Sequence, residues 1–219
     1  EGVYATLTAA MVDLNARGVS ADVNFLLTDT LYSTGETFPL LANITNENLT
    51  SPTKKVTIKP STGITSKVSG SSTSGIFVSF GADYIILDGS NSGGKDRNLT
   101  FENINSAANT YVIGIFNNGT KGAQNNTIKN CIVKAGGTAN NTWSIILNAL
   151  GGGYTNTTIQ NNLLLNSRTA IQFAGVLGGV TNGGLVTENL IGSDNDVESV
   201  GNLGLLTSYV DGLSISKNT

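Results

Sequence analysis

The sequence predicts an all-β fold, a right-handed parallel β-helix in which the chain winds into stacked coils, and three observations favour it. Short apolar runs alternate with turns rich in Gly and Asn, each of which occurs 27 times in the 219 residues. Charged residues make up only 12% of the chain, about half of what a globular protein usually carries. Strand-like blocks ending in Asn recur every 27 to 31 residues, a period typical of a solenoid.

Residues 1–21 are predicted to form an N-terminal cap that contains one amphipathic helix. From Thr6 to Arg17, the apolar residues at positions 7, 10, 11 and 14 fall on one helical face, and Gly18 follows the end of the pattern. A single helix ahead of a solenoid covers the open apolar end of the first coil. Residues 22–219 form the predicted β-helix, and Val23–Leu27 is its first strand.

Five blocks of alternating apolar and polar residues define the repeat in the second half of the chain, because such alternation marks strands with one buried face. They are Leu99–Asn103, Thr127–Asn130, Thr158–Asn161, Leu185–Asn189 and Leu213–Asn218. A second set of strands lies between them, at Tyr111–Phe116, Ser144–Leu147, Ala170–Phe173 and Leu203–Leu206. Each coil therefore contains at least two strands. Stacking the blocks predicts that Glu102 neighbours Lys129, and that Glu188 neighbours Lys217.

The Asn that closes each block is predicted to be structural. The set is Asn103, Asn130, Asn161, Asn189 and Asn218. An Asn at a strand end adopts the left-handed conformation readily, and stacked amides can hydrogen-bond from coil to coil as an asparagine ladder. A ligand-binding role for these amides is the alternative.

The C-terminal end is predicted to be uncapped, because Thr219 directly follows a repeat strand. An open coil exposes apolar core and backbone pairing groups. We therefore expect further chain beyond it, a partner that covers it, or self-association through it into a stalk or filament.

Residue types limit the chemistry. The chain has no His, which removes Ser-His and Cys-His catalysis, and its single Cys131 lies in an apolar run that predicts a buried structural thiol. The remaining carboxylates include no Asp-Asp pair, so the sequence predicts no catalytic site and no enzyme. A net charge of −3 with scattered cations disfavours nucleic acid, and no apolar run approaches the roughly 20 residues of a membrane span.

An acidic segment and two aromatic residues are candidate binding sites. Asp194, Asp196 and Glu198 place three carboxylates within one short segment, so calcium is the one cofactor considered, with a solvated loop as the alternative. Aromatic residues are few and form no exposed stripe in the sequence. Trp143 and Tyr154 flank a Gly-rich segment and could touch a glycan, but packing at a strand start is the preferred interpretation.

The order of several blocks resembles the β-helix region of large secreted surface proteins of Bacteroidetes and related bacteria. The blocks are Leu7–Ala10 with Leu14-Asn15 and Gly18-Val19, Val23–Asp29, Glu36–Leu40, Val56–Pro60, Gly81–Ser90 and Asn126–Cys131. The resemblance implies a right-handed β-helix of pectate-lyase-like fold without catalytic residues, and export to the cell surface. Asp29-Thr30-Leu31 also resembles the short O-glycosylation signal of that phylum, which makes Thr30 a possible glycosylation site.

Together these features predict a non-enzymatic structural or adhesive module of a secreted or cell-surface bacterial protein. Its expected partners are cell-surface or matrix glycans or proteins. The alternative is a carbohydrate-active β-helix that binds or cleaves polysaccharide along one outer face. An outer face lined by acidic and aromatic residues would favour this alternative, and a featureless face of Thr, Asn and Lys would favour the first hypothesis.

Overall fold

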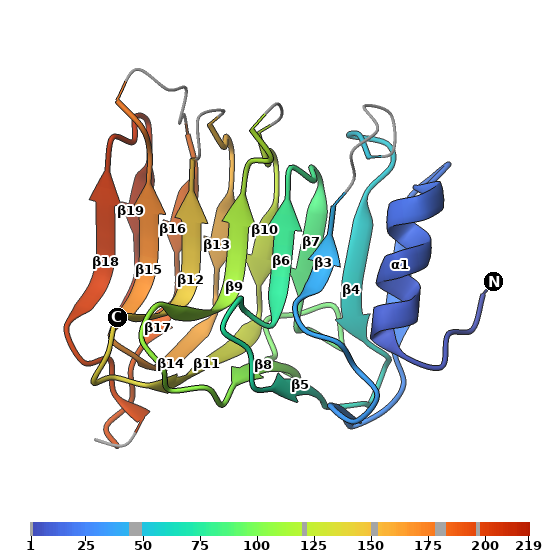
Figure 1. Cartoon of the computed structure of the whole chain (residues 1–219), viewed down its shortest axis with the longest axis horizontal. Helices are drawn as coiled ribbons and strands as arrows, with labels where there is room; N and C mark the ends of the chain where they lie inside the picture. Colours follow the sequence, from blue (N-terminus) through green and yellow to red (C-terminus); the bar gives the residue numbers. More distant parts are fainter. Residues whose placement is uncertain (1, 44–49, 120–121, 150–152, 178–182, 196–197) are drawn as a thin grey trace.

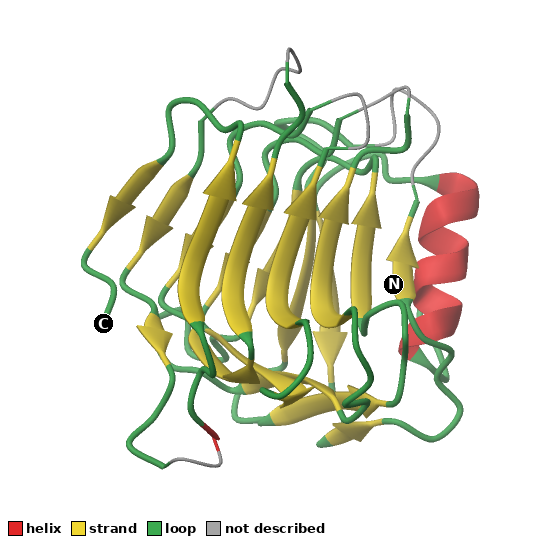
Figure 2. Cartoon of the chain, turned by 60° about the vertical axis from the view of Figure 1, so that its left-hand side comes forward, coloured by secondary structure: helices red, strands yellow, loops and turns green. Residues whose placement is uncertain are grey.

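The computed structural model describes residues 2–43, 50–119, 122–149, 153–177, 183–195 and 198–219. The fold is a parallel β-solenoid of about six turns with one short helix near the N-terminus, which confirms the predicted fold class (Figures 1 and 2). Each of the six coils contributes one strand to each of three parallel sheets, called A, B and C in chain order, and β19 adds a seventh strand to sheet A.

The strands of each sheet follow the axis of the solenoid. Sheet A contains β1 (Val23–Leu27), β4 (Val56–Pro60), β7 (Ile85–Asp88), β10 (Thr127–Lys129), β13 (Thr158–Gln160), β16 (Leu185–Thr187) and β19 (Ser214–Ser216). Sheet B contains β2 (Leu31–Tyr32), β5 (Ser66–Gly70), β8 (Leu99–Asn103), β11 (Cys131–Gly137), β14 (Leu163–Ser167) and β17 (Leu190–Ile191). Sheet C contains β3 (Leu40–Ala42), β6 (Phe77–Phe80), β9 (Thr110–Phe116), β12 (Thr142–Asn148), β15 (Thr169–Ala174) and β18 (Leu203–Ser208).

The core consists of columns of like side chains stacked from coil to coil. In sheet A the strand register aligns one inward residue of each coil, and these residues are Phe25, Ile58, Leu87, Ile128, Ile159, Val186 and Ile215. The five central members are at most 2% exposed, while Ile215 in the last strand is 53% exposed. Burial of about 1.5–3 kcal/mol per large apolar side chain makes such columns the main stabilising element of the fold.

The N-terminal helix α1 (Leu7–Arg17) lies where the sequence predicts it and packs against β3 at the first coil. Thr6 caps its start by accepting a hydrogen bond from Ala9 N at 3.1 Å, and Gly18 ends it with a φ of 64°. The four predicted inward residues are the ones that the structure buries, namely Leu7, Ala10, Met11 and Leu14. The carboxylate of Glu36 accepts hydrogen bonds from the free N–H groups of Leu7 and Thr8, which ties the helix start to the first coil.

The predicted stacking of the first repeat block is wrong. Leu99–Asn103 is β8 of sheet B, whereas the other four blocks lie in sheet A. Glu102 therefore does not neighbour Lys129. Its carboxylate forms an ion pair with Lys67 at 2.5 Å, and Lys129 pairs with Asp88 at 3.1 Å.

The last coil is more exposed than the coils before it. In β18 and β19 no residue is fully buried, and the exposed apolar side chains include Leu203, Leu206 and Ile215. The predicted uncapped end thus corresponds to the exposed strands β18 and β19, and self-association through it stays a prediction.

A loop of the third coil crosses the corner between sheets A and B. We call residues 89–98, which join β7 to β8, the strap. Arg97 donates two hydrogen bonds to Asn161 of the fifth coil, from Nε to the backbone oxygen and from Nη2 to Oδ1, both at 2.8 Å. Lys95 forms an ion pair with Glu188 of the sixth coil at 2.7 Å. The strap therefore connects coils that are not neighbours in the stack.

Asp96 holds the strap in shape and gives it a pH dependence. Its carboxylate accepts hydrogen bonds from the hydroxyls of Ser92 and Ser90, from Asn91 N and from Asn98 Nδ2, and these bonds hold its pKa well below the usual range. Because the pKa of Asp96 in the folded state lies below the ordinary Asp value of about 4, the ionised carboxylate stabilises the fold at pH values above about 4. This stabilisation is lost as the pH falls toward the folded-state pKa.

We therefore expect Asp96→Ala to lower the thermal midpoint at neutral pH. The gap between wild type and variant should shrink steadily below about pH 4, because protonation removes the same hydrogen bonds from the wild-type protein. Thermal unfolding measured across pH checks this. A gap that stays constant down to the most acid pH would show that the Asp96 carboxylate is not the source of the effect.

Candidate functional site

The predicted asparagine ladder exists, and it runs through Asn162, Asn189 and Asn218 at the start of sheet B. Each amide oxygen accepts from the backbone N–H of the residue one coil earlier, with distances of 3.0 Å from Cys131, 2.9 Å from Asn162 and 3.0 Å from Asn189. Each amide nitrogen donates to a backbone oxygen of the preceding coil, at 2.9 Å in all three cases. Neighbouring side chains also bond amide to amide, at 3.0 and 2.9 Å.

The five predicted ladder residues divide into three groups, and only Asn103 lacks an Asn partner one coil away. Asn130 and Asn161 occupy the preceding corner position with φ values of 57° and 51°, and Asn161 donates to Asn130 at 2.8 Å. Asn103 ends β8 and bonds to Ser72 and to the backbone oxygen of Tyr111. Asn189 and Asn218 belong to the ladder that starts at Asn162, Asn130 and Asn161 form a separate amide pair at the corner, and the prediction is wrong for Asn103. Since the ladder and corner amides bond within the protein, the structure gives them a structural role.

The thiol of Cys131 and the carboxylate of Asp88 likewise have structural roles. Cys131 is fully buried, and desolvation raises the pKa of its thiol far above the usual range, which makes it unreactive. Asp88 accepts from Ser90 N and Asn130 Nδ2 in addition to its ion pair with Lys129. Within the described ranges, no three His, Cys, Asp or Glu residues come together in a way that could hold a metal ion.

The structure does not assemble the predicted calcium site from the residues it describes. Asp194 is exposed, and Asp196 lies outside the described residues. Glu198 forms an ion pair with Lys134 of the fourth coil at 2.9 Å, so a cation already occupies its carboxylate. The predicted O-glycosylation site, Thr30, is exposed in the turn between β1 and β2, and its glycosylation stays a prediction.

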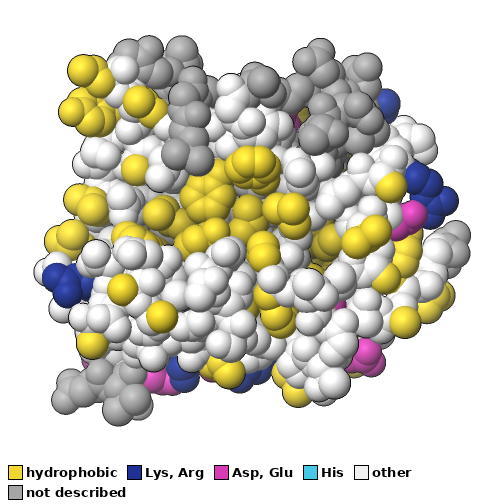
Figure 3. Space-filling view, in the orientation of Figure 1, with side chains coloured by type: hydrophobic (Ala, Val, Ile, Leu, Met, Phe, Trp, Pro, Cys, Tyr) yellow, Lys and Arg dark blue, Asp and Glu magenta, His cyan; other side chains and the backbone are white. Residues whose placement is uncertain are grey.

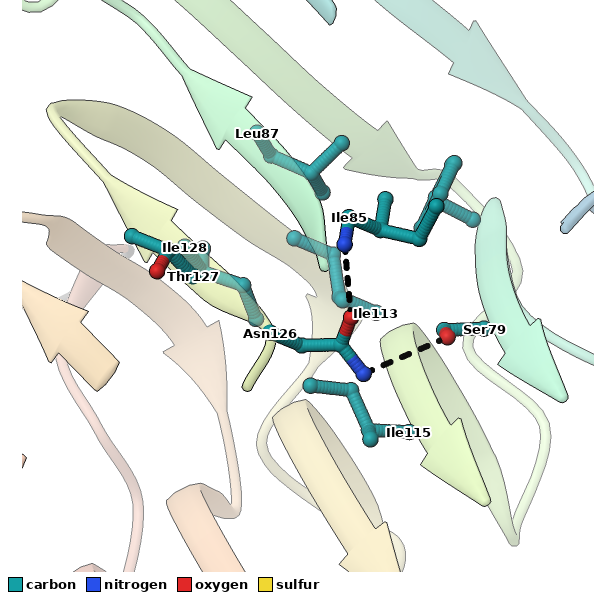
Figure 4. Close-up of a pocket in the computed structure, with 9 residues that line it drawn as sticks. Ser79, Ile85, Leu87, Ile113, Ile115, Asn126, Thr127 and Ile128 are labelled. Atoms are coloured by element: carbon teal, nitrogen blue, oxygen red, sulfur yellow. Dashed lines mark hydrogen bonds between the residues drawn. The ribbon is translucent and has the colours of Figure 1, made fainter. Parts of the chain in front are cut away.

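An interior cavity between sheets A and C is too small for a ligand. Figure 4 shows its lining, in which Asn126 accepts from Ile85 N at 2.9 Å and faces the hydroxyl of Ser79 at 3.5 Å. Most of the other lining side chains are aliphatic, and the cavity volume is about 10 Å³. This volume is roughly that of one water molecule. This cavity therefore has no room for a ligand larger than water.

A larger groove of about 410 Å³ lies at the N-terminal end, between residues 2–7 and β1. The tyrosine hydroxyls in its lining are already bonded within the protein. Tyr4 donates to Asp13, and the Tyr32 oxygen accepts from Thr28 N and Asp29 N at 2.9 and 3.1 Å. These contacts hold the chain around the first coil, and both tyrosine hydroxyls already form hydrogen bonds within the protein.

The outer face of sheet C carries an aromatic cluster. Tyr111 and Phe116 meet edge to face, with ring centroids 5.5 Å apart and an interplanar angle of 79°. Both rings lie over Gly114, where a Cβ atom would come within 2.4 Å of Phe116 and 2.8 Å of Tyr111. Gly114 alternates with the inward residues Ile113 and Ile115, so the two rings are on the outer surface. Figure 3, drawn from the side of sheet C, shows hydrophobic side chains gathered in the middle of this face.

Trp143 extends the cluster into the next coil. It is the register partner of Tyr111 and, like Tyr111 and Phe116, it is partly buried. We call Tyr111, Phe116 and Trp143 the aromatic cluster. The sequence does not predict this cluster, although it offers Trp143 as a possible glycan contact. Tyr154, the other aromatic residue noted there, is fully buried against Phe173 in the core.

The strands that carry the cluster are uncharged. The strands of sheet C contain no Asp, Glu, Lys or Arg, whereas strands of sheets A and B contain Lys59, Asp88, Lys129, Lys67, Glu102 and Lys134. Burial raises the pKa of Tyr111 to about 12, so its phenol is neutral at physiological pH. In the same register rows, Asn148 lies beside Phe116, and Gln172 lies beside Ile146. The face therefore combines three aromatic rings with neutral amides.

In the part of the chain that the structure describes, no helix has the length and apolarity required to cross a bilayer. Comparison of the chain with protein-family models, with curated proteins and with solved structures finds no match in any of the three. The resemblance to Bacteroidetes surface proteins therefore stays an expectation, and the outer face of sheet C is the candidate site on its geometry alone.

Proposed function

We propose that this chain is a non-enzymatic structural and adhesive module of a secreted or cell-surface bacterial protein, which binds its partner through the outer face of sheet C. The proposal rests on a difference in charge between the strands of sheet C and those of sheets A and B. Charged side chains on the strands are confined to sheets A and B, and the aromatic cluster lies on the uncharged sheet. Clustered Tyr and Trp are the residue types most enriched at binding hot spots.

The carboxylates support a role without catalysis. Retaining and inverting glycosidases need a pair of carboxyl groups that flank the bond to be cut. Here Asp88, Glu102 and Glu188 each have a lysine partner, and Asp96 is bound by hydroxyl and amide donors. The aromatic cluster, by contrast, contains only rings, and its neighbours in the sheet are neutral.

The proposal is tested by separating binding from cleavage. The chain is incubated with soluble polysaccharides and with immobilised matrix proteins, and both retention and reaction products are measured. We expect retention on at least one of these partners, with no new reducing ends and no unsaturated sugar products. Release of either product by the purified chain would contradict the non-enzymatic role and would favour a polysaccharide-cleaving β-helix.

A further inference from the structure

We propose that the outer face of sheet C binds an uncharged polysaccharide, with Tyr111, Phe116 and Trp143 as its stacking surface. This inference rests on the proposed adhesive function and names its ligand class. It is distinct from the non-enzymatic part of that function, because a bound polysaccharide could be cut or left intact.

The first argument is that the rings are held in place before any ligand binds. Tyr111 packs against Gly75 and Gly114, where an added Cβ would come within 2.3 and 2.8 Å of its ring. Phe116 meets the edge of the same ring. Rings fixed by such packing lose little conformational entropy on binding, which favours affinity for a ligand with weak individual contacts.

The second argument is the chemistry of the surroundings. A sugar ring offers a C–H face for stacking and hydroxyls at its edge, so its binding site needs aromatic faces with neutral hydrogen-bonding groups beside them. Asn148 and Gln172 supply amides that both donate and accept, and they occupy outward positions next to the cluster. The strands of sheet C contain no charged residue, so they offer an acidic polysaccharide no cation, and Arg168 directly before β15 is the nearest one in the sequence.

The third argument is the direction of the site. Tyr111 and Trp143 are register partners on β9 and β12, and Phe116 and Asn148 are register partners on the same two strands. Neighbouring strands are about 4.8 Å apart, so both rows run along the solenoid axis. An extended sugar chain lying along this axis would contact two rings in the first row, or a ring and then an amide in the second.

The test uses the full chain and named probes. Affinity electrophoresis compares the neutral polysaccharides xylan, mannan, β-glucan and amylose with the acidic polysaccharides polygalacturonate and alginate. We expect the wild-type chain to be retarded by at least one neutral polysaccharide, and we expect the retardation to be independent of salt, because the binding face is uncharged.

The variants locate the site. Trp143→Ala and Tyr111→Ala are each expected to weaken binding at least about tenfold, as loss of a hot-spot aromatic does. Tyr111→Phe keeps the ring and should retain most of the affinity. Tyr209→Ala is the matched control, since Tyr209 is 62% exposed and follows the end of β18. Circular dichroism and the thermal midpoint show that each variant is folded. Gln172→Lys, on the surface beside Ile146, is a second test that leaves the rings intact, and it should also weaken binding.

Each outcome decides the proposal. Binding only to acidic polysaccharides, or neutral binding that survives Trp143→Ala, Tyr111→Ala and Gln172→Lys, would overturn it. Retention on matrix proteins without any glycan binding would also overturn it while leaving the adhesive function intact. Cleavage of a bound neutral polysaccharide would keep the ligand class and overturn the non-enzymatic function instead.

Discussion

Replacing Asn162 by Ala is expected to destabilise the protein by about 3–5 kcal/mol. The Asn162 side chain is fully buried, and it bonds to the N–H of Cys131 and to the carbonyl of Ile128. The substitution leaves both backbone groups buried without a partner, and each such group costs about 1–3 kcal/mol. For a chain of this length the thermal midpoint should fall by roughly 10 °C, which calorimetry or circular dichroism measures.

The control for this prediction is Asn24→Ala, because Asn24 is an exposed strand residue of β1. Its midpoint should stay close to that of the wild type. Asn162→Asp adds a pH test. The carboxylate cannot donate to the Ile128 carbonyl, so its folded-state pKa is raised, and the deficit should grow as the pH rises through that pKa. Equal midpoints for Asn162→Ala and Asn24→Ala would contradict a stabilising role of the ladder.

Gly136→Ala is expected to destabilise the protein by about 3 kcal/mol or more. A Cβ atom at this position would lie 2.2 Å from the backbone oxygen of Asn105 and 2.9 Å from the nitrogen of Ser106. Both atoms belong to the backbone of the preceding coil, so no side-chain rotation can relieve the clash, and the two coils must separate locally.

The adjacent residue provides a matched control. At Gly137 the nearest atom to an added Cβ is the Ser106 Cβ at 3.7 Å, which is an ordinary contact. Gly137→Ala should therefore be neutral or slightly stabilising, since it reduces the freedom of the unfolded chain. Denaturant unfolding of the two variants checks this. If they unfold at the same denaturant concentration, the close approach of the third and fourth coils is not what the structure describes.

The sequence predicts most of the architecture, because the helix and the strands of sheet C have strong local signals. It merges sheets A and B, since a single corner residue such as Asn130 separates β10 from β11 and leaves no visible turn. The same corner explains the shifted ladder. Asn161 and Asn162 are adjacent, yet one adopts the left-handed conformation and the other points inward to the ladder. The Asn that closes a block is therefore a corner residue in some blocks and a ladder residue in others.

The aromatic cluster could not be found from strand alternation. Tyr111 and Phe116 are five residues apart, which places them on opposite faces of a regular strand. In the structure Val112 and Ile113 are both fully buried, so the alternation of inward and outward residues is interrupted between them, and both rings lie on the outer face. Trp143 joins them only through the pairing of β9 with β12. The cluster therefore depends on tertiary geometry, and no local pattern encodes it.

The strap has a mechanical consequence for an adhesive module. A stack held together only by neighbouring contacts peels from its end, one coil at a time, when it is pulled. Here Arg97 and Lys95 of the third coil bind Asn161 and Glu188 of the fifth and sixth coils, and Glu198 of the sixth coil binds Lys134 of the fourth. A pulling force applied at the C-terminal end must break these longer connections together with the sheet, so the load is shared across four coils, including the two that contain the aromatic cluster.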